Sequence, residues 1–344
     1  MSNYNVAILG ATGVVGQELV QILLERRFPM GKLRLLASAR SAGRELNVDG
    51  ERMIIEEVTP ESFAGVDLAF FTAGASVSRE FVDAARKAGT VVIDNTSAFR
   101  MDPAVPLIVP EVNAKDIHQH QGVIANPNCS TIIMVVPLKP LHDRARIKRI
   151  VVSTYQAVSG AGAAAMDELV EQVKSYAAGR PLEAKVLPYK SAPKHYQIAF
   201  NLIPHIDSFA EDGYTKEEWK MVNETQKIFG DKTIQVTATT VRVPVLRSHS
   251  ESVNVEFAKP ISPEEAKALL ADASGVVVQD DPEVMEYPMP LDVADQDPVY
   301  VGRIRVDRTV PHGLNLWVVG DQIRKGAALN SVQIAEYMVA NGLL

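Results

Sequence analysis

Cys129 is the only cysteine of this 344-residue chain, and its surroundings favour reactivity. It stands in the run NPNCST, residues 126–131, between the strand-like residues 122–125 and the apolar residues 132–136. Asn128 or Ser130 can cap a helix here, which places Cys129 at or beside a helix N-terminus. The dipole and the unpaired N–H groups of such an end stabilise a thiolate and can hold an oxyanion. We therefore predict a nucleophilic thiol, although free cysteines are commonly buried structural residues.

A glycine-rich loop is the second chemical feature. It follows the apolar residues 6–9 and opens residues 14–26, whose apolar side chains have helical spacing. Glycines spaced G-x-x-G-x-x-G allow a sharp turn, and the helix N-terminus behind them attracts a pyrophosphate. A tight strand–helix turn without a ligand is the alternative. The predicted dinucleotide-binding residues are Gly10, Thr12, Gly13, Val14, Val15 and Gly16.

The end of the next predicted strand indicates which dinucleotide is bound. An NAD site usually has an acidic residue there for the ribose hydroxyls. This chain has Ser38, Arg40 and Ser41 instead, a guanidinium and two hydroxyls that suit a 2′-phosphate. We therefore expect NADP(H), unless Arg40 is merely a solvated surface residue.

The order of the predicted elements suggests how these residues are positioned. In residues 6–125, short apolar strands alternate with amphipathic helices, which predicts a parallel sheet with helices on both faces. Longer strands of alternating polarity follow, at residues 147–157, 234–245, 252–258, 299–307 and 314–319. Helices are expected at residues 163–178, 215–229 and 262–273, the second with Thr215 and Glu218 as a capping box. This half predicts a mixed or antiparallel sheet, and the helix at 327–344 could return to the first domain.

Composition excludes several classes of protein. Lys and Arg number 35 against 42 Asp and Glu, so the net charge of −7 argues against nucleic acid as a partner. No apolar run is long enough to span a bilayer, and no secretory signal is visible. His118 and His120 lack the further ligands that a metal site needs. We expect a cytoplasmic protein without a metal.

Several motifs occur together in an order that resembles the aspartate-β-semialdehyde dehydrogenase family, a branch of the glyceraldehyde-3-phosphate-dehydrogenase-like superfamily. The matching segments span the chain: residues 10–16, 97–100, 126–131, 156 with 159–160, 217–220, 242 with 247–249, and 315–317. The resemblance implies an α/β Rossmann-like NADP-binding domain, residues 1–129 and 325–344. It also implies an α+β catalytic and dimerisation domain, residues 130–324, with a mixed, largely antiparallel sheet, and a homodimer.

The family's reaction is the NADPH-dependent reductive dephosphorylation of L-aspartyl-4-phosphate to L-aspartate 4-semialdehyde through a cysteine thioester. It serves the biosynthesis of lysine and diaminopimelate, threonine, methionine and isoleucine. The resemblance implies the following roles: Cys129 as nucleophile, His249 as general acid–base and Gln156 as the orienting glutamine; Arg242, Glu217, Lys220, Arg100 and Asn128 at the substrate; and Ser159, Gly160 and Gln322 near the nicotinamide.

Some of these roles have support from the residues alone. The guanidinium group of Arg242 can bind a carboxylate through two parallel hydrogen bonds, which lysine cannot do. Glu217 and Glu218 compete for the substrate ammonium, and Glu217 is preferred because Glu218 belongs to the capping box. Lys220 and Arg100 could instead be ordinary solvated charges without a role in binding. Pro244, between Arg242 and His249, departs from some relatives and could mark a sheet edge or a bulge.

Two rival functions are considered. An N-acetyl-γ-glutamyl-phosphate reductase would use the same chemistry on a longer, acylated substrate, but Glu217 would then have no ammonium to bind. A non-catalytic NADP-binding redox sensor would oxidise Cys129 reversibly. The cations Arg100, Lys220 and Arg242 argue against a sensor, which needs no phosphate clamp.

Overall fold

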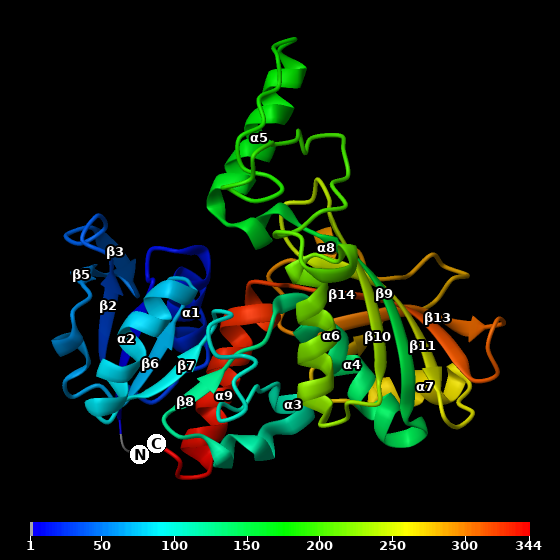
Figure 1. The fold of residues 1–344 in the computed structure, drawn as a ribbon, viewed down its shortest axis with the longest axis horizontal. Coiled ribbons are helices and arrows are strands. Elements are labelled where there is room, and N and C mark those ends of the chain that lie inside the picture. The colour runs from blue at the N-terminus through cyan, green and yellow to red at the C-terminus, as the bar shows by residue number, and fades with distance from the viewer. Residues whose placement is uncertain (1–2) are drawn as a thin grey trace. The chain divides into compact units, whose positions relative to one another are not determined.

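The computed structural model describes residues 3–344 and divides the chain into two compact units (Figure 1). The first unit runs up to Asn128 and resumes at Ala327, and the second is Cys129–Gly326. No helix in the part of the chain that is described is long and apolar enough to cross a membrane.

The first unit is built on a parallel sheet in the order β5-β2-β1-β6-β7-β8. Its strands are β1 (Tyr4–Leu9), β2 (Met30–Ala37), β5 (Glu56–Glu57), β6 (Leu68–Phe71), β7 (Val91–Asp94) and β8 (Val123–Ala125). The helices are α1 (Val14–Glu25), α2 (Ala75–Lys87), α3 (Pro110–Asn113) and α9 (Leu329–Ala340), and a hairpin joins β3 (Glu45–Val48) to β4 (Glu51–Ile54).

The inner strands β1 and β6 of this sheet are apolar on both faces. Ile8 and Phe70 belong to the core formed with α1 and α9. Phe71, which points to the other face, contacts Phe63. Continuous apolar strands of this kind belong to a parallel sheet covered by helices on both sides, as the sequence pattern predicted.

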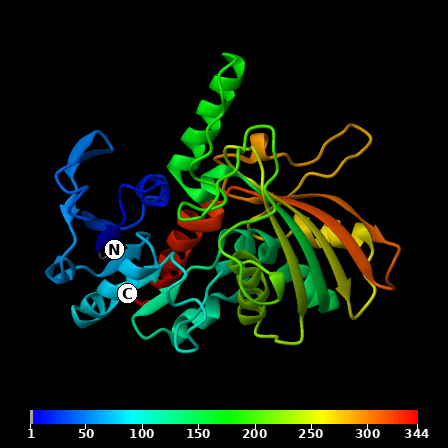
Figure 2. The ribbon, with the colours of Figure 1, turned by 45° about the horizontal axis from the view of Figure 1, so that its top comes forward.

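The second unit contains a mixed sheet in the order β10-β9-β11-β14-β13-β12. Its strands are β9 (Ile147–Gln156), β10 (Gln235–Arg242), β11 (His249–Phe257), β12 (Val276–Val278), β13 (Val299–Asp307) and β14 (Gly313–Gly320). Its helices are α4 (Cys129–Ala145), α5 (Ala163–Ala177), α6 (Lys216–Phe229), α7 (Pro263–Ala271) and α8 (Pro290–Val293). In Figure 2, α7 (yellow) lies along the strands of this sheet, and α5 (green) extends away from them.

One end of this sheet brings polar residues into a row. Arg242 pairs with Gln156, and His249 pairs with Gly320. The pairing of Ser250 with Tyr155 places His249 next to Gln156. A Cβ atom on Gly320 would come within 2.9 Å of Ile133, so α4 covers this end of the sheet. The row therefore faces the helix that begins with Cys129.

Several predicted boundaries differ from the structure. The strand expected at 234–245 ends at Arg242, because the edge strand β10 stops before Pro244, which has no N–H to pair. The strand expected at 252–258 begins earlier, at His249. The last helix, expected at 327–344, is α9 preceded by a π-helix, Arg324–Ala328. The capping box of Thr215 and Glu218 is confirmed.

Candidate active site

The glycine loop connects β1 to α1 with very little space. Gly10 has φ +98°, and a Cβ atom there would lie 2.4 Å from Oγ1 of Thr72. A Cβ atom on Gly16 would lie 2.3 Å from the carbonyl oxygen of Gly10, so only glycine allows the helix to approach the strand. Gly13 is the N-cap of α1 and supplies no side-chain cap, which leaves the first N–H groups of the helix for an anion. Thr12, Val14 and Val15 flank this cap.

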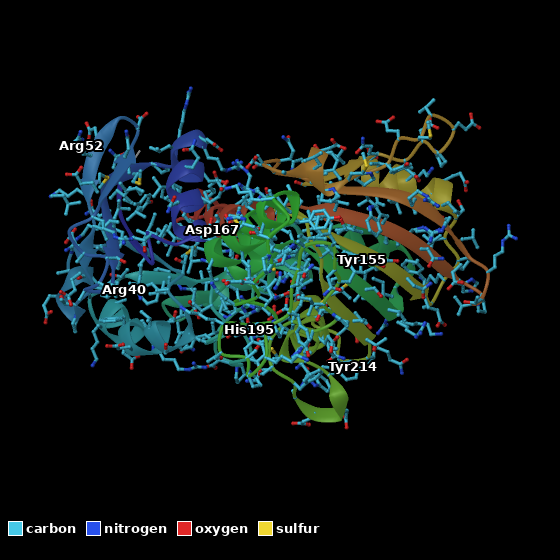
Figure 3. The ribbon with its side chains drawn as sticks, turned by 90° about the horizontal axis from the view of Figure 1, so that it is seen from above. Arg40, Arg52, Tyr155, Asp167, His195 and Tyr214 are labelled. Carbon is cyan, nitrogen blue, oxygen red and sulfur yellow. The ribbon has the colours of Figure 1, made fainter. Side chains whose placement is uncertain are left out.

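The residues predicted to read the ribose phosphate follow β2. Leu36 of β2 pairs with Leu9 of β1, so Gly10 and Ser38 leave the sheet at the same edge. The N–H of Ser41 donates to the carbonyl of Ser38 at 2.8 Å and closes a turn. Arg40 in this turn is exposed, and it is labelled in Figure 3. The loop and this turn together fit a dinucleotide phosphate chain with an additional anionic group.

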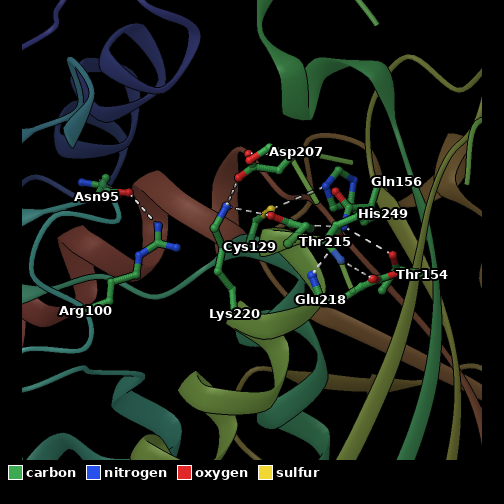
Figure 4. Close-up of polar contacts among 12 residues, drawn as sticks. Asn95, Arg100, Cys129, Thr154, Gln156, Asp207, Thr215, Glu218, Lys220 and His249 are labelled. Carbon is green, nitrogen blue, oxygen red and sulfur yellow. Dashed lines mark hydrogen bonds and ion pairs between the residues drawn. The ribbon is translucent and has the colours of Figure 1, made fainter. Parts of the chain in front are cut away.

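Arg100 and Asn128 also belong to the first unit, and both are buried. Nε of Arg100 donates to the carbonyl oxygen of Asn126 at 2.9 Å, and Nη2 donates to that of Asn95 at 2.8 Å. The Asn95 contact is drawn in Figure 4. Arg100 is therefore held by the segment that leads from β8 to Cys129.

Cys129 is the first residue of α4, as the sequence predicted, and it is half-buried. Its sulfur lies 3.5 Å from Nε2 of His249, the first residue of β11 (Figure 4). Thiol and imidazole, 120 residues apart in the sequence, are therefore in contact. A thiol at the end of a long helix beside an imidazole can act as a nucleophile.

The ring of His249 is completely buried, and its other nitrogen is also engaged. The N–H of Ala157 donates to Nδ1 at 3.1 Å. Burial, the largest cause, and the nearby charge of Arg242 lower the pKa of His249 to about 3, against the opposing effect of Glu217. The imidazole is therefore neutral at physiological pH.

Arg242 ends β10 as a fully buried guanidinium beside His249. Nη1 donates to the carbonyl oxygen of Ala157 at 2.7 Å, whereas Nε has no hydrogen-bond partner among the described residues. Burial lowers its pKa, and the neighbouring Glu217 and Cys129 oppose that shift. A Cβ atom on Gly160 would lie 2.8 Å from Nη1 and 3.1 Å from Cε1 of His249. Gly160 is thus needed for this close approach.

A chain of hydrogen bonds leads from Gln156 to α6. Nε2 of Gln156 donates to Oε1 of Glu217 at 3.2 Å and to Oγ1 of Thr154 at 3.3 Å. Nζ of Lys220 lies 3.0 Å from both Oε2 of Glu217 and Oδ2 of Asp207. A carboxylate and an ammonium group therefore stand on one helix, in the same unit as Cys129, His249 and Arg242.

Glu218 is occupied by the fold itself. It accepts from the N–H of Thr215 at 2.7 Å and from the N–H of Thr240 at 3.0 Å. Both of its oxygens thus hold backbone groups, which favours Glu217 as the residue that receives a ligand.

Ser159 and Gln322 contact each other through Oγ and Nε2. The amide oxygen of Gln322 also accepts from the N–H of Ser248 at 2.8 Å. Ser248 has φ +72°, an unusual conformation that orients the backbone directly before His249. Ser159 and Gln322 therefore support the loop that positions the imidazole.

Four residues of this region were absent from the sequence prediction: Thr154, Ala157, Asp207 and Gly326. A Cβ atom on Gly326 would lie 3.0 Å from Cβ of Cys129, so the π-helix packs directly on the nucleophile. Ala157 acts through its backbone, which no residue type can reveal. Asp207, with φ +66°, carried no signal in the sequence beyond its charge.

The described residues contain no group of three or more His, Cys, Asp or Glu side chains able to hold a metal ion. The first unit carries a dinucleotide loop. The second unit brings together a thiol, an imidazole, an amide, a guanidinium, a carboxylate and an ammonium group. This combination defines a two-domain dehydrogenase that uses a cysteine nucleophile.

Comparison with known proteins supports this class. The family described as "Semialdehyde dehydrogenase, NAD binding domain" matches residues 5–120, and "Semialdehyde dehydrogenase, dimerisation domain" matches residues 138–325. Aspartate-semialdehyde dehydrogenase of Aquifex aeolicus is 54% identical, over 99% of each chain. The enzyme of that name from Bacillus subtilis is 51% identical, over 96% of each chain. The chain belongs to the aspartate-semialdehyde dehydrogenase family.

Solved structures agree with this assignment. Aspartate semialdehyde dehydrogenase II of Vibrio cholerae, complexed with ASA, has a TM-score of 0.94 and 46% identity, over 99% of each chain. The Candida albicans enzyme with NADP has a TM-score of 0.78 and 26% identity, over the whole of both chains.

Proposed function

We propose that this chain catalyses the reaction after which its family is named: the NADPH-dependent conversion of L-aspartyl-4-phosphate to L-aspartate 4-semialdehyde and phosphate, in the biosynthesis of lysine, threonine, methionine and isoleucine. The observation that carries the proposal is the contact between Cys129 and His249, with Arg242 and Glu217 in the same unit. A thiolate can displace phosphate from an acyl phosphate and hold the acyl group as a thioester.

The charged residues match the groups of this substrate. The fork of Arg242 suits the α-carboxylate, because Nε has no partner in the described structure. Glu217 suits the α-ammonium, and Gln156, bonded to Glu217, can orient the acyl oxygen. Lys220 and Arg100 are proposed to bind the phosphate. Asn128, which directly precedes the nucleophile in the sequence, is also proposed to bind the substrate. An acylated substrate has no ammonium group for Glu217 to bind, which disfavours the glutamyl-phosphate rival.

The first unit supplies the cofactor site. Bound NADPH provides the hydride that reduces the thioester. Gly10, Gly13 and Gly16 allow the close backbone approach that a pyrophosphate needs, and the first N–H groups of α1 face it. Ser38 and Arg40 are exposed at the same sheet edge and suit a 2′-phosphate.

Replacing Arg40 by alanine is expected to weaken NADP(H) binding while leaving NAD(H) binding nearly unchanged. A charge-assisted hydrogen bond contributes about 1.5–3 kcal/mol, which corresponds to a loss of roughly 10- to 150-fold in the preference for NADP. The ratio of kcat/KM for the two cofactors measures the effect. Arg52→Ala, on the neighbouring hairpin, is the control and should keep the ratio. An unchanged ratio in Arg40→Ala would show that Arg40 does not contact the phosphate.

The function is tested in the oxidative direction, with aspartate semialdehyde, phosphate and NADP. The protein should form NADPH repeatedly only when all three are present, since phosphate releases the acyl group from Cys129; without phosphate it should form at most one NADPH per chain. N-acetylglutamate semialdehyde, offered under the same conditions, should react poorly. Turnover of that compound alone would favour the rival enzyme, and turnover of neither would favour the redox sensor.

We further propose a homodimer formed by the sheet face of the second unit that α4 does not cover. This face carries half-buried side chains of β9, β11 and β14, among them Val151, Tyr155, Asn254 and Trp317. The rings of Tyr155 and Trp317 lie 5.5 Å apart, and Tyr155 is labelled in Figure 3. The match to a dimerisation domain over residues 138–325 supports this surface. A cytoplasmic location remains a prediction.

Val151→Glu is expected to convert the dimer to a monomer, because it places a charge on this face beside Thr237 and Asn254. Light scattering after size exclusion should give twice the mass of one chain, 37.5 kDa, for the wild type and that mass for the variant. Lys148→Glu, at the exposed start of β9, is the control. If the variant stays dimeric, the dimer interface must lie on another surface.

A further inference from the structure

A second row of polar residues crosses the sheet next to the row that contains Gln156 and His249. Thr240 of β10 pairs with Thr154 of β9, and Thr154 pairs with Glu251 of β11. All three residues are completely buried. Each of them stands two positions along its strand from a residue of the first row, so both rows point to the same face of the sheet. That face is the one that α4 covers.

Several polar atoms of this second row have no hydrogen-bond partner among the described residues. They are both carboxyl oxygens of Glu251 and the hydroxyl oxygen of Thr240. The hydroxyl oxygen of Thr154 accepts from Nε2 of Gln156 at 3.3 Å (Figure 4), but no described residue accepts the hydrogen of that hydroxyl. Buried polar groups in proteins are bonded directly or through an internal water, and such a water makes about three hydrogen bonds. The second row offers a water that number of partners.

The carboxyl of Glu251 is expected to be uncharged in the folded protein. The ionisable groups on the elements around it are Cys129 of α4, Glu217, Glu218 and Glu224 of α6, Arg242 of β10, His249 of β11 and Lys325 of the π-helix. None of them bonds to the carboxyl, and burial alone raises its pKa well above the ordinary value of 4.5. An uncharged carboxyl can donate one hydrogen bond and accept others, whereas an ionised one can only accept.

We propose that Glu251, as an uncharged acid, holds the hydroxyl of Thr154 through one internal water and thereby positions the amide of Gln156. The amide nitrogen of Gln156 donates to two acceptors, Glu217 and Thr154. Since Glu217 is proposed to bind the substrate, Thr154 is the acceptor that stays fixed during the reaction. Glu251 is thus a positioning residue that touches neither substrate nor cofactor. This role rests on the proposed function, in which Gln156 orients the acyl group.

Infrared spectroscopy tests the charge of Glu251 without any substrate. A protonated carboxyl group has a carbonyl band that ionised carboxylates lack, so the difference between the spectra of the wild type and Glu251→Gln at pH 6 should contain this band. Glu256→Gln is the matched control, because Glu256 lies on the same strand in an ion pair with Lys148 at 2.6 Å. The difference spectrum of the control should contain no such band. Absence of the band for Glu251→Gln would overturn the proposal.

The dependence of stability on pH provides a second test of the charge. Because the pKa of Glu251 is raised in the folded protein, ionisation of this carboxyl in the unfolded chain opposes folding above pH 4.5, increasingly so up to the folded-state pKa. Over this range the unfolding equilibrium constant of the wild type should rise relative to that of Glu251→Gln by up to about tenfold per pH unit. The Tm of Glu251→Gln should therefore gain on that of the wild type between pH 5 and pH 8. A difference in Tm that stays constant would contradict an uncharged Glu251.

Crystal structures test the water itself. In the wild type, one internal water should lie within hydrogen-bond distance of both the carboxyl of Glu251 and the hydroxyl of Thr154. In Glu251→Leu the same position should be apolar and dry. A wild-type structure without a water at this position would overturn the proposal.

Kinetics test the positioning role. Glu251→Leu has a similar size but cannot bond to a water, and Thr154→Val lacks the hydroxyl. Each is expected to lower kcat by about 3- to 10-fold, the effect of one neutral hydrogen bond, and to leave the KM for phosphate and the NADP affinity nearly unchanged. Glu251→Gln keeps a donor and an acceptor and should retain most of kcat. Because Glu251 and Thr154 act through the same hydroxyl, the double variant should lose no more than the worse single variant.

Equal losses in Glu251→Gln and Glu251→Leu, multiplied losses in the double variant, or a lower Tm with unchanged kcat would each overturn the positioning role. A wild type inactive on aspartate semialdehyde would instead refute the proposed function. The side-chain amide signal of Gln156, assigned by its absence from Gln156→Ala, then still reports the positioning by nuclear magnetic resonance. It should shift in Glu251→Leu and stay in place in Glu251→Gln. An unchanged signal in Glu251→Leu would show that Glu251 does not position Gln156.

Discussion

Cys129→Ala is expected to abolish turnover, with a loss of about 10⁴-fold or more, because no other described group can form the thioester. The substitution removes one sulfur from a half-buried position, so the fold should survive. NADP affinity should be unchanged, since the glycine loop belongs to the other unit. Kinetics with aspartate semialdehyde and a binding titration with NADP measure the two effects separately.

The single cysteine makes this prediction unusually direct to check. Any acyl group or alkylating reagent attached to a thiol of this chain must be on Cys129. Mass spectrometry of wild type mixed with aspartate semialdehyde and NADP, without phosphate, should show one added acyl group, and Cys129→Ala should show none. Turnover of Cys129→Ala at a rate near that of the wild type would refute the thioester mechanism.

The second large effect is expected for Arg242→Lys. Lysine keeps the positive charge but loses the fork that can hold a carboxylate while Nη1 remains bonded to Ala157. Truncating a buried, charged hydrogen-bond partner costs about 2–4 kcal/mol, so kcat/KM should fall by about 30- to 1,000-fold. The KM for aspartate semialdehyde should rise, and the KM for phosphate should change little.

Arg146→Lys serves as the control. Arg146 makes a surface ion pair with Asp231 at 3.2 Å, and its side chain is 65% exposed, so its replacement should not alter the kinetics. If Arg242→Lys lowered only thermal stability and left both KM values unchanged, Arg242 would be a structural residue. Another positively charged residue would then have to bind the substrate carboxylate.

Local signals in the sequence predicted much of the first unit. Glycine spacing, apolar strands and helix stops are short-range features, and the predicted strand at 6–9 and helix at 14–26 correspond to β1 and α1. The hairpin of β3 and β4 was not predicted, because its strands are short and polar and largely exposed. Local pattern also identified Cys129 as the start of a helix.

The second unit shows where local pattern fails. The residue types at 242 and 249 say nothing about their proximity, which depends on how β10, β9 and β11 pair. Only the family resemblance singled out His249 among seven histidines. The contact from Ala157 to its ring is made by a backbone N–H, so no side-chain pattern encodes it. Glu251 is a further case: an acidic residue that the fold buries, with neither oxygen bonded to a described group.

The π-helix described above has a mechanical consequence. The chain enters the second unit at Cys129 and leaves it at Gly326, and these two residues are packed against each other. A methyl group at residue 326 would require Cys129 to shift by a few tenths of an ångström. The small size of Gly326 therefore sets how closely the π-helix can approach the start of α4, and with it where the sulfur lies.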